Sequence, residues 1–420
     1  MISLSRQQFS AIRIASGLAW RYVLARLLSV SGLLLAAYFY DPHDFAVFGF
    51  YVASLNIASI VYFLRFDGAI VSIARDKLLQ PIFHLCLWVG GFTTLVFIGT
   101  FLIGVALGLI SPLIAFCFVL ALVGRGFIRL STLLATREGD FTFLGRMMML
   151  QSVVQPFALF SLMTTSLAGF LVLLLADIAG VLCALCFCLW HFRKQSDLFS
   201  GFWRDVKNVP VHMRAWRALP ILNLPSSMLA VVFSSLPLLF VSFMASPLLA
   251  GHVALAGRIL DMPTQLIGAA ATPLMLNRFN EKSLSLFSKI RVVLSFYALS
   301  ILVFFGLISV FIYVFSPLLI DTKWQDLLII LPILTIFYAG LSIAGPLIEV
   351  ESTFQSQKTF LTIQIVACLS ALTAALLFQE HLFFLLVIFG SISILRGLMI
   401  MSDVMRLYRL SVTDDVESKA

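Results

Sequence analysis

The residues of this sequence that could support chemistry are ionisable side chains placed inside long apolar runs. Only 11% of the 420 residues are charged, whereas 61% are hydrophobic, so charges within the apolar runs are few. A charge at the depth of a lipid bilayer is costly unless it is paired or faces water, and each one therefore marks a candidate site. The candidates for contact with a bound molecule in a central cavity are Arg26, Arg65, Asp177, Arg258, Asp261 and Arg396.

Two of these candidates, Arg258 and Asp261, are close enough in sequence to share one face of a helix. They can form a structural ion pair with each other, or they can both offer their charges to a cavity. If Arg26, Arg258 and Arg396 converge on one cavity, it would bind phosphate well, because guanidinium forks match phosphate oxygens in pairs. A pyrophosphate group with a lipid tail and a sugar head would fit, and so would another anion.

Three carboxylates, Asp177, Asp261 and Glu349, are candidates for coupling to H⁺ or Na⁺, because ionisable residues within spans often serve ion and proton pathways. The sequence does not choose between the two ions. For Glu349, a solvated helix end is the alternative explanation, and the one we favour. Arg125 and Arg129 lie nearer one end of their apolar run. We interpret them as side chains that extend to the membrane surface and set orientation.

Motifs for enzymatic chemistry are absent from the sequence. It contains no G-x-x-x-x-G-K-[ST], H-E-x-x-H or G-x-S-x-G pattern, so we predict no enzyme and no cofactor. The cysteines of the segment 183–188 imitate a metal spacing together with His191, but they lie within one apolar helix, and packing explains them better. The net charge of +8 comes from Lys and Arg placed between apolar runs, which argues against nucleic acid as a partner.

Long apolar runs of about 20 residues are the elements that must position these side chains. Turn signals separate several of the runs, immediately before Pro42, Pro112, Pro247 and Pro317. The predicted fold is an all-α polytopic membrane protein with about twelve transmembrane helices. The expected spans are residues 14–40, 44–64, 82–109, 112–131, 147–166, 169–190, 219–244, 248–275, 292–315, 327–348, 360–378 and 382–404.

Lys and Arg are concentrated in every second loop, whereas the opposite loops hold one such residue, Lys323. By the positive-inside rule, both chain termini are then cytoplasmic. The longest internal polar stretch divides the chain into two halves, and its apolar residues between 199 and 206 predict a short helix on the membrane surface. The predicted domains are a six-helix bundle at 1–191, a cytoplasmic amphipathic linker at 192–217, a second six-helix bundle at 218–405 and a cytoplasmic tail at 406–420.

Three segments resemble the Wzx-type flippases, the polysaccharide-biosynthesis members of the multidrug/oligosaccharidyl-lipid/polysaccharide (MOP) exporter superfamily. They are LRFDGAIV at 64–71, the stretch from Leu224 to Pro263 with GHVALAGRILDMP at its end, and the stretch from Trp324 to Gln364 with its internal IAGPL. The chain departs from the family pattern at His252, where Tyr is frequent, and at Lys323, where Gly-Glu often precedes Trp.

This resemblance implies a MATE-like arrangement of two six-helix bundles around a central cavity, working by alternating access. It also implies transport of undecaprenyl-pyrophosphate-linked oligosaccharide from the cytoplasmic to the periplasmic leaflet of a bacterial inner membrane. Arg26 and Arg258 would contact the diphosphate. Membrane lipids are partners, and a polysaccharide polymerase and chain-length proteins are candidate partners.

Two alternatives to a flippase stay open. The first is a cation-coupled exporter of small molecules from the same superfamily. The second is a membrane polymerase or ligase that joins sugar units. Such enzymes usually need a sizeable extracytoplasmic loop, and the largest expected here spans only residues 316–326.

Overall fold

The computed structural model consists of helices and turns, with no strand among the residues that it describes. Nine helices in this described part are long and apolar enough to cross a membrane. A further apolar helix, Val23–Phe39, and the long helices α6 and α10 overlap the remaining predicted spans. The predicted all-α, multi-pass membrane architecture is therefore confirmed. The structure describes residues 23–25, 27–72, 78–193, 198, 200, 202–203, 205–244, 247–280, 284–315, 323–351 and 358–417.

The chain forms two compact units. The first contains residues 1–40 and 51–228, and the second contains residues 41–50 and 229–420. Helices α2 and α9 each have residues in both units, because the division falls inside them. The domains predicted from the sequence are defined by chain order and by the side of the membrane on which each segment lies. They stay predictions.

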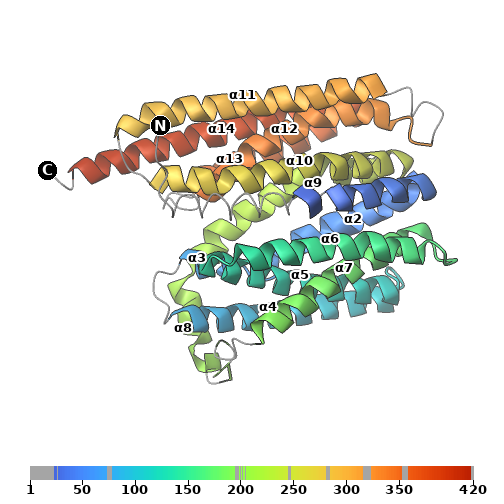
Figure 1. Cartoon of the computed structure of the whole chain (residues 1–420), viewed down its shortest axis with the longest axis horizontal. Helices are drawn as coiled ribbons and strands as arrows, with labels where there is room; N and C mark the ends of the chain where they lie inside the picture. Colours follow the sequence, from blue (N-terminus) through green and yellow to red (C-terminus); the bar gives the residue numbers. More distant parts are fainter. Residues whose placement is uncertain are drawn as a thin grey trace. The chain divides into compact units, whose positions relative to one another are not determined.

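In the first unit, helices α4 to α7 pack along one another (Figure 1). The start of α6 is fixed by Asp140, whose side chain accepts a hydrogen bond of 3.0 Å from the backbone N–H of Phe143. The elements with residues in this unit are α2 (Pro42–Val61), η1 (Phe66–Gly68), α3 (Ala69–Ser72), α4 (Leu79–Ala106), α5 (Pro112–Glu138), α6 (Phe141–Leu162), α7 (Gly169–Phe192), η4 (Asp205–Asn208), α8 (Val209–Ala215), η5 (Leu219–Asn223) and α9 (Leu224–Met244).

In the second unit, α12 occupies the centre, where it contacts α10, α11 and α14, and α13 packs on α14 (Figure 1). Helix α14 continues without a break beyond its predicted span, into the segment predicted as a tail. Besides the parts of α2 and α9, the helices of this unit are α10 (Pro247–Asn280), α11 (Leu284–Phe315), α12 (Leu327–Glu351), α13 (Lys358–Leu377) and α14 (Leu382–Glu417).

Proline begins several helices, as the turn signals predict. Helices α2, α5 and α10 start at Pro42, Pro112 and Pro247. Proline suits the first helical position because its missing N–H would have no partner there and its φ is already helical. The fourth predicted turn, before Pro317, lies outside the described residues.

Helices α12 and α14 approach each other backbone to backbone. A Cβ atom on Gly340 would lie 2.3 Å from the carbonyl carbon of Ser393 and one on Gly397 would lie 2.9 Å from the carbonyl oxygen of Gly340. The Ser393 hydroxyl donates a 2.8 Å hydrogen bond to the carbonyl oxygen of Phe337 across the same contact. Small residues of this kind let transmembrane helices pack closely, and they fix this helix pair.

The linker between α7 and α9 is held against α4 by aromatic rings and a buried histidine. Phe202 stacks on Trp88 with ring centroids 4.8 Å apart, and Nδ1 of the fully buried His84 lies 2.6 Å from a carboxylate oxygen of Asp205. Among the described residues of this linker, the α-helix is α8, which comes later in the chain than the predicted segment 199–206. Phe202 and Trp203 instead form a turn.

Candidate functional site

Asp177 on α7, in the first unit, is held by Arg125 on α5. A carboxylate oxygen of Asp177 lies 3.0 Å from Nη2 of Arg125, and the carboxylate side chain is only 7% exposed. The other terminal nitrogen of Arg125 donates a 2.8 Å hydrogen bond to the side chain of Asn56 on α2. A cation that bound Asp177 would have to displace Arg125. Ion coupling at Asp177 stays a prediction.

A second buried ion pair lies close to the turn that follows α2. Nε of Arg129 is 2.5 Å from a carboxylate oxygen of Asp67, whose side chain is 1% exposed. The interpretation of Arg125 and Arg129 as side chains that reach the membrane surface is therefore wrong. Each is bound to a carboxylate inside the first unit, and the pairing offsets the cost of burying both charges.

Arg65 belongs to the same turn as Asp67, and it binds the end of another helix, η5. Its Nε donates a 3.2 Å hydrogen bond to the side-chain oxygen of Asn223, which also accepts a 3.0 Å hydrogen bond from Ser227. Leu64 and Arg65 both have positive φ values, of 48° and 66°. Such left-handed conformations are costly outside glycine, so the turn depends on the contacts of Arg65 and Asp67.

In the second unit, Arg258 and Asp261 lie on one face of α10, half-buried. The guanidinium of Arg258 lies over the ring of Phe48, 5.4 Å from its centroid. The carboxylate of Asp261 accepts a hydrogen bond from the side-chain amide of Gln265, one turn further along the same face. A positive and a negative charge thus lie together on this face of α10, and each contacts a neutral side chain.

A line of hydroxyl groups joins α10 to α12 and α11 beside these charges. The Tyr338 hydroxyl on α12 lies 2.8 Å from the position of a Cβ on Gly257, immediately before Arg258. Further along, the Thr264 and Ser342 hydroxyls are 3.0 Å apart, and Tyr297 donates a 2.8 Å hydrogen bond to the carbonyl oxygen of Ser342. The α10 face therefore carries a cation and an anion beside several hydroxyl groups, and those of Thr264, Ser342 and Tyr297 already donate hydrogen bonds within the unit.

Arg396 on α14 is buried among the helices of the second unit, with an exposed fraction of 2%. Its Nε donates a 2.8 Å hydrogen bond to Gln364 on α13, and its guanidinium lies 4.6 Å from the ring centroid of Phe233 on α9. Nη1 of Arg396 is buried and donates no hydrogen bond to any residue that the structure describes. Contact with a substrate at Arg396 stays a prediction, and it would require these helices to separate.

Two other predicted site residues cannot be located. Arg26 lies outside the described residues, and for Glu349 the structure describes the backbone of α12 but not the side chain. Asp177 and Arg65 lie in the first unit, whereas Arg258 and Asp261 share one helix face in the second.

Sequence reasoning missed the partners of the charged residues. Asp67 was visible as the charge within LRFDGAIV, but the residue that binds it, Arg129, belongs to another helix. Asn56, Gln265 and Gln364 are amides within apolar helices, and a polar amide inside an apolar run is the signal that could have identified them.

Solved structures similar to this chain include membrane transporters of the MATE family and the MOP superfamily. An inward-facing multidrug resistance MATE transporter of the MOP superfamily matches with a TM-score of 0.62 and 16% identity, over 96% of each chain. A eukaryotic MATE transporter matches with a TM-score of 0.61 and 12% identity, over 97% of this chain and 99% of that one.

A third similar structure is a MOP superfamily transporter from Pyrococcus furiosus, with a TM-score of 0.56, 14% identity and coverage of 94% of this chain and 96% of that one. It is described as having a binding pocket of reverse polarity that suggests a different function. At these identities the likeness establishes the fold. No protein-family model matches the chain, and neither does any curated protein sequence.

Proposed function

We propose that this protein is a transporter that moves undecaprenyl-pyrophosphate-linked oligosaccharide from the cytoplasmic to the periplasmic leaflet of a bacterial inner membrane, by alternating access. The MATE-like fold supports a transporter, and the three segments that resemble Wzx-type flippases support the lipid-linked cargo. In this proposal both termini are cytoplasmic, and a polysaccharide polymerase and chain-length proteins use the product.

The observation that carries the proposal is the setting of Arg258. The guanidinium of Arg258, with its fork of N–H donors, lies over the ring of Phe48, 5.4 Å from the ring centroid. From there they can bind the oxygens of a pyrophosphate in pairs, and the low dielectric of the membrane strengthens each contact. The Tyr338 hydroxyl beside Gly257 adds a neutral donor of the kind that a sugar or phosphate oxygen accepts.

A second candidate function is export of small molecules coupled to a cation. Asp261 favours it, because a half-buried carboxylate on α10 is suited to binding H⁺, Na⁺ or a cationic compound. Some transporters with the same fold are described as multidrug resistance proteins. The two functions place different demands on the same helix face, since one needs Arg258 and the other needs Asp261.

Deletion of the gene separates the two functions at the level of the cell. Under the proposal, the cell loses surface polysaccharide and accumulates the lipid-linked unit in the inner leaflet. A change in drug sensitivity with intact polysaccharide would instead support the small-molecule exporter.

Variants of Arg258 test the site itself in the deletion strain. We expect Arg258→Ala to abolish complementation and Arg258→Lys to retain part of it, because lysine keeps the charge but loses the planar fork. Loss of one charge-assisted contact should weaken binding by about ten- to hundredfold. Arg214→Ala, on the exposed face of α8, is the matched control.

The rival explanation, a structural pair between Arg258 and Asp261, has its own test. If the pair is structural, Arg258→Ala lowers the amount of folded protein and the double variant Arg258→Ala with Asp261→Ala restores both folding and transport. Membrane abundance is measured beside complementation for all variants. Recovery of transport in the double variant would overturn substrate contact by Arg258.

A further inference from the structure

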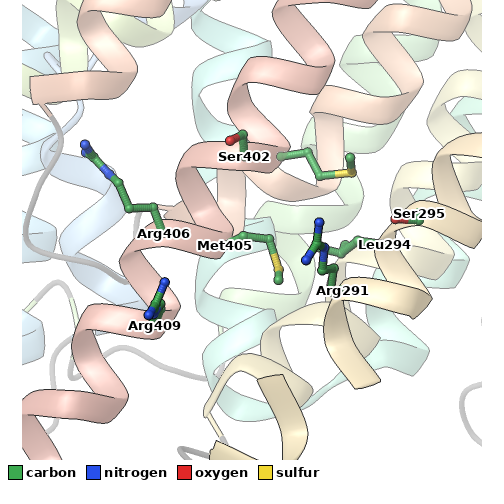
Figure 2. A pocket seen from close by; sticks show the side chains of 8 residues that line it. Arg291, Leu294, Ser295, Ser402, Met405, Arg406 and Arg409 are labelled. Atoms are coloured by element: carbon green, nitrogen blue, oxygen red, sulfur yellow. The ribbon is translucent and has the colours of Figure 1, made fainter. Parts of the chain in front are cut away.

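A cavity with arginine walls lies in the second unit, between the beginning of α11 and the end of α14. Its volume is about 420 Å³. Arg291 and Ser295 come from α11, whereas Met405, Arg406 and Arg409 come from α14 (Figure 2). None of these residues belongs to the α10 face or to the other site candidates, so the cavity is a separate feature.

The cavity carries an excess of positive charge. Three of its lining residues are arginines, and no acidic residue lines it among those that the structure describes. The nearby carboxylate of Asp403 binds Arg406, with 2.9 Å between the charged atoms, and Arg406 also donates a 3.0 Å hydrogen bond to Thr359. One carboxylate beside three guanidinium groups leaves a site that favours an anion.

The cavity lies where the apolar spans end. The apolar part of α11 runs over Ile290–Val314 and that of α14 over Leu382–Leu410, so Arg291 lies in the first turn of its span and Arg406 and Arg409 lie within the last five residues of theirs. At this depth a spanning helix meets the phosphate groups of the bilayer rather than its hydrocarbon. By the distribution of Lys and Arg, this is the predicted cytoplasmic side.

Apolar side chains continue the same helix faces toward the membrane interior. On α11, Leu299 and Leu302 follow Ser295 at helical spacing and are 58% and 37% exposed. On α14, which runs antiparallel to α11 here, Leu398 and Leu395 precede Ser402 at helical spacing and are 37% and 60% exposed. Along both helix faces, arginine and serine are therefore followed by leucine in the same direction. A lipid molecule has the same order, with a polar headgroup followed by apolar acyl chains.

We propose that this cavity binds the phosphate headgroup of an anionic phospholipid, with its acyl chains against the leucines of α11 and α14. The arginines supply charge-assisted hydrogen bonds to the phosphate, and the serine hydroxyls at 295 and 402 can donate to its remaining oxygens. The proposal is independent of the transported cargo. A polyprenyl pyrophosphate shares the headgroup chemistry, so the experiment must distinguish the two lipids.

The test uses the purified full chain and native mass spectrometry in detergent, with phosphatidylglycerol, phosphatidylethanolamine, a polyprenyl pyrophosphate and inorganic phosphate as separate probes. We expect phosphatidylglycerol to bind more tightly than phosphatidylethanolamine. We also expect Arg291→Gln and Arg409→Gln each to weaken its binding by about tenfold, the effect of losing one contact to a charged group. Arg406 is left unchanged because it also neutralises Asp403.

Three controls keep the result interpretable. Arg291→Lys should retain most of the binding, since it keeps the charge, and Arg214→Gln should retain all of it. Thermal unfolding of each variant shows that the protein is intact. Equal binding of inorganic phosphate, or phosphatidylglycerol binding that is unchanged in Arg291→Gln and Arg409→Gln, would overturn the proposal. Preference for the polyprenyl pyrophosphate over phosphatidylglycerol would also overturn it, and would assign the cavity to a polyprenyl carrier.

Discussion

The two compact units hold their intramembrane arginines in different ways. In the first unit, Arg125 and Arg129 are each bound to a carboxylate, on Asp177 and Asp67. In the second unit, Arg396 is bound to an amide and lies over a phenyl ring, and no carboxylate pairs with it among the described residues. One unit thus neutralises its buried charge internally, whereas the other retains a cation.

This difference separates residues that hold the fold from residues that can act on a ligand. A buried ion pair depends on both members, so removing one strands the other at a high energetic cost. An arginine held by neutral groups strands no charge when it is removed. Arg396 is therefore a better candidate for contact with a ligand than Arg125 or Arg129, and the variants below test the contrast.

The largest effect is expected when the buried pair of the first unit is broken. Arg129→Ala leaves the carboxylate of Asp67 without its cation in an environment where it is 1% exposed, and should cost about 3 to 5 kcal/mol of stability. The measurement is thermal unfolding in detergent. The double variant Arg129→Ala with Asp67→Ala should recover much of the loss. An unstable double variant would mean that the turn after α2, rather than the charge, is at fault.

A smaller effect is expected from Gly340→Ala in the second unit. The new methyl group would overlap the backbone of Ser393 and should cost about 1 to 3 kcal/mol. Gly345→Ala is the control on the same helix, because nothing lies within 4 Å of its Cβ position. In the first unit, Gly126→Ala meets side-chain atoms of the Tyr62 ring rather than backbone atoms, so its loss should be smaller. An equal loss at positions 126 and 340 would contradict this contrast in packing.

His84→Ala should have a moderate, local effect on the linker. The side chain is 0% exposed, and its ring nitrogens lie 2.6 Å from Asp205 and 2.8 Å from the carbonyl oxygen of Leu198. Losing these contacts should cost about 1 kcal/mol and loosen the linker. Limited proteolysis between α7 and α8 measures this, with Gln80→Ala as the control for a more exposed contact. Unchanged cleavage would show that the aromatic stacking on Trp88 is sufficient.

The smallest change in stability is expected for Arg396→Met. Replacing a buried charge by an apolar side chain of similar size is often neutral or stabilising, because the cost of desolvation disappears. We expect a change in unfolding temperature close to zero or slightly upward. Complementation of transport is measured in parallel. A loss of stability as large as that of Arg129→Ala would remove the difference between the units.

The helices could be predicted from sequence because each is long and apolar, and the prolines mark where α2, α5 and α10 begin. The ends of α10 and α14 could not be predicted in this way. Helix α14 continues to Glu417, beyond the predicted end of the span at 404. Hydropathy reports where a chain leaves the bilayer, whereas backbone hydrogen bonding can continue into water.

The partners of the charged residues depend on tertiary structure and left no local signal. Arg125 and Asp177 are 52 positions apart, so sequence spacing indicates nothing about their contact. The same holds for His252 and Lys323, the two departures from the flippase pattern. They are 71 positions apart, yet a ring nitrogen of His252 lies 3.3 Å from the carbonyl oxygen of Lys323.

The close contact between α12 and α14 also limits how the second unit can move. Because Gly340 lies against the backbone of Ser393, translation of one helix along the other would bring bulkier neighbours, such as Ile394, into a space that admits only a hydrogen atom. The contact therefore fixes how α12 and α14 are aligned along their lengths. Sliding of one helix past the other would require this contact to open, so a movement that keeps the contact carries this part of α12 and α14 together.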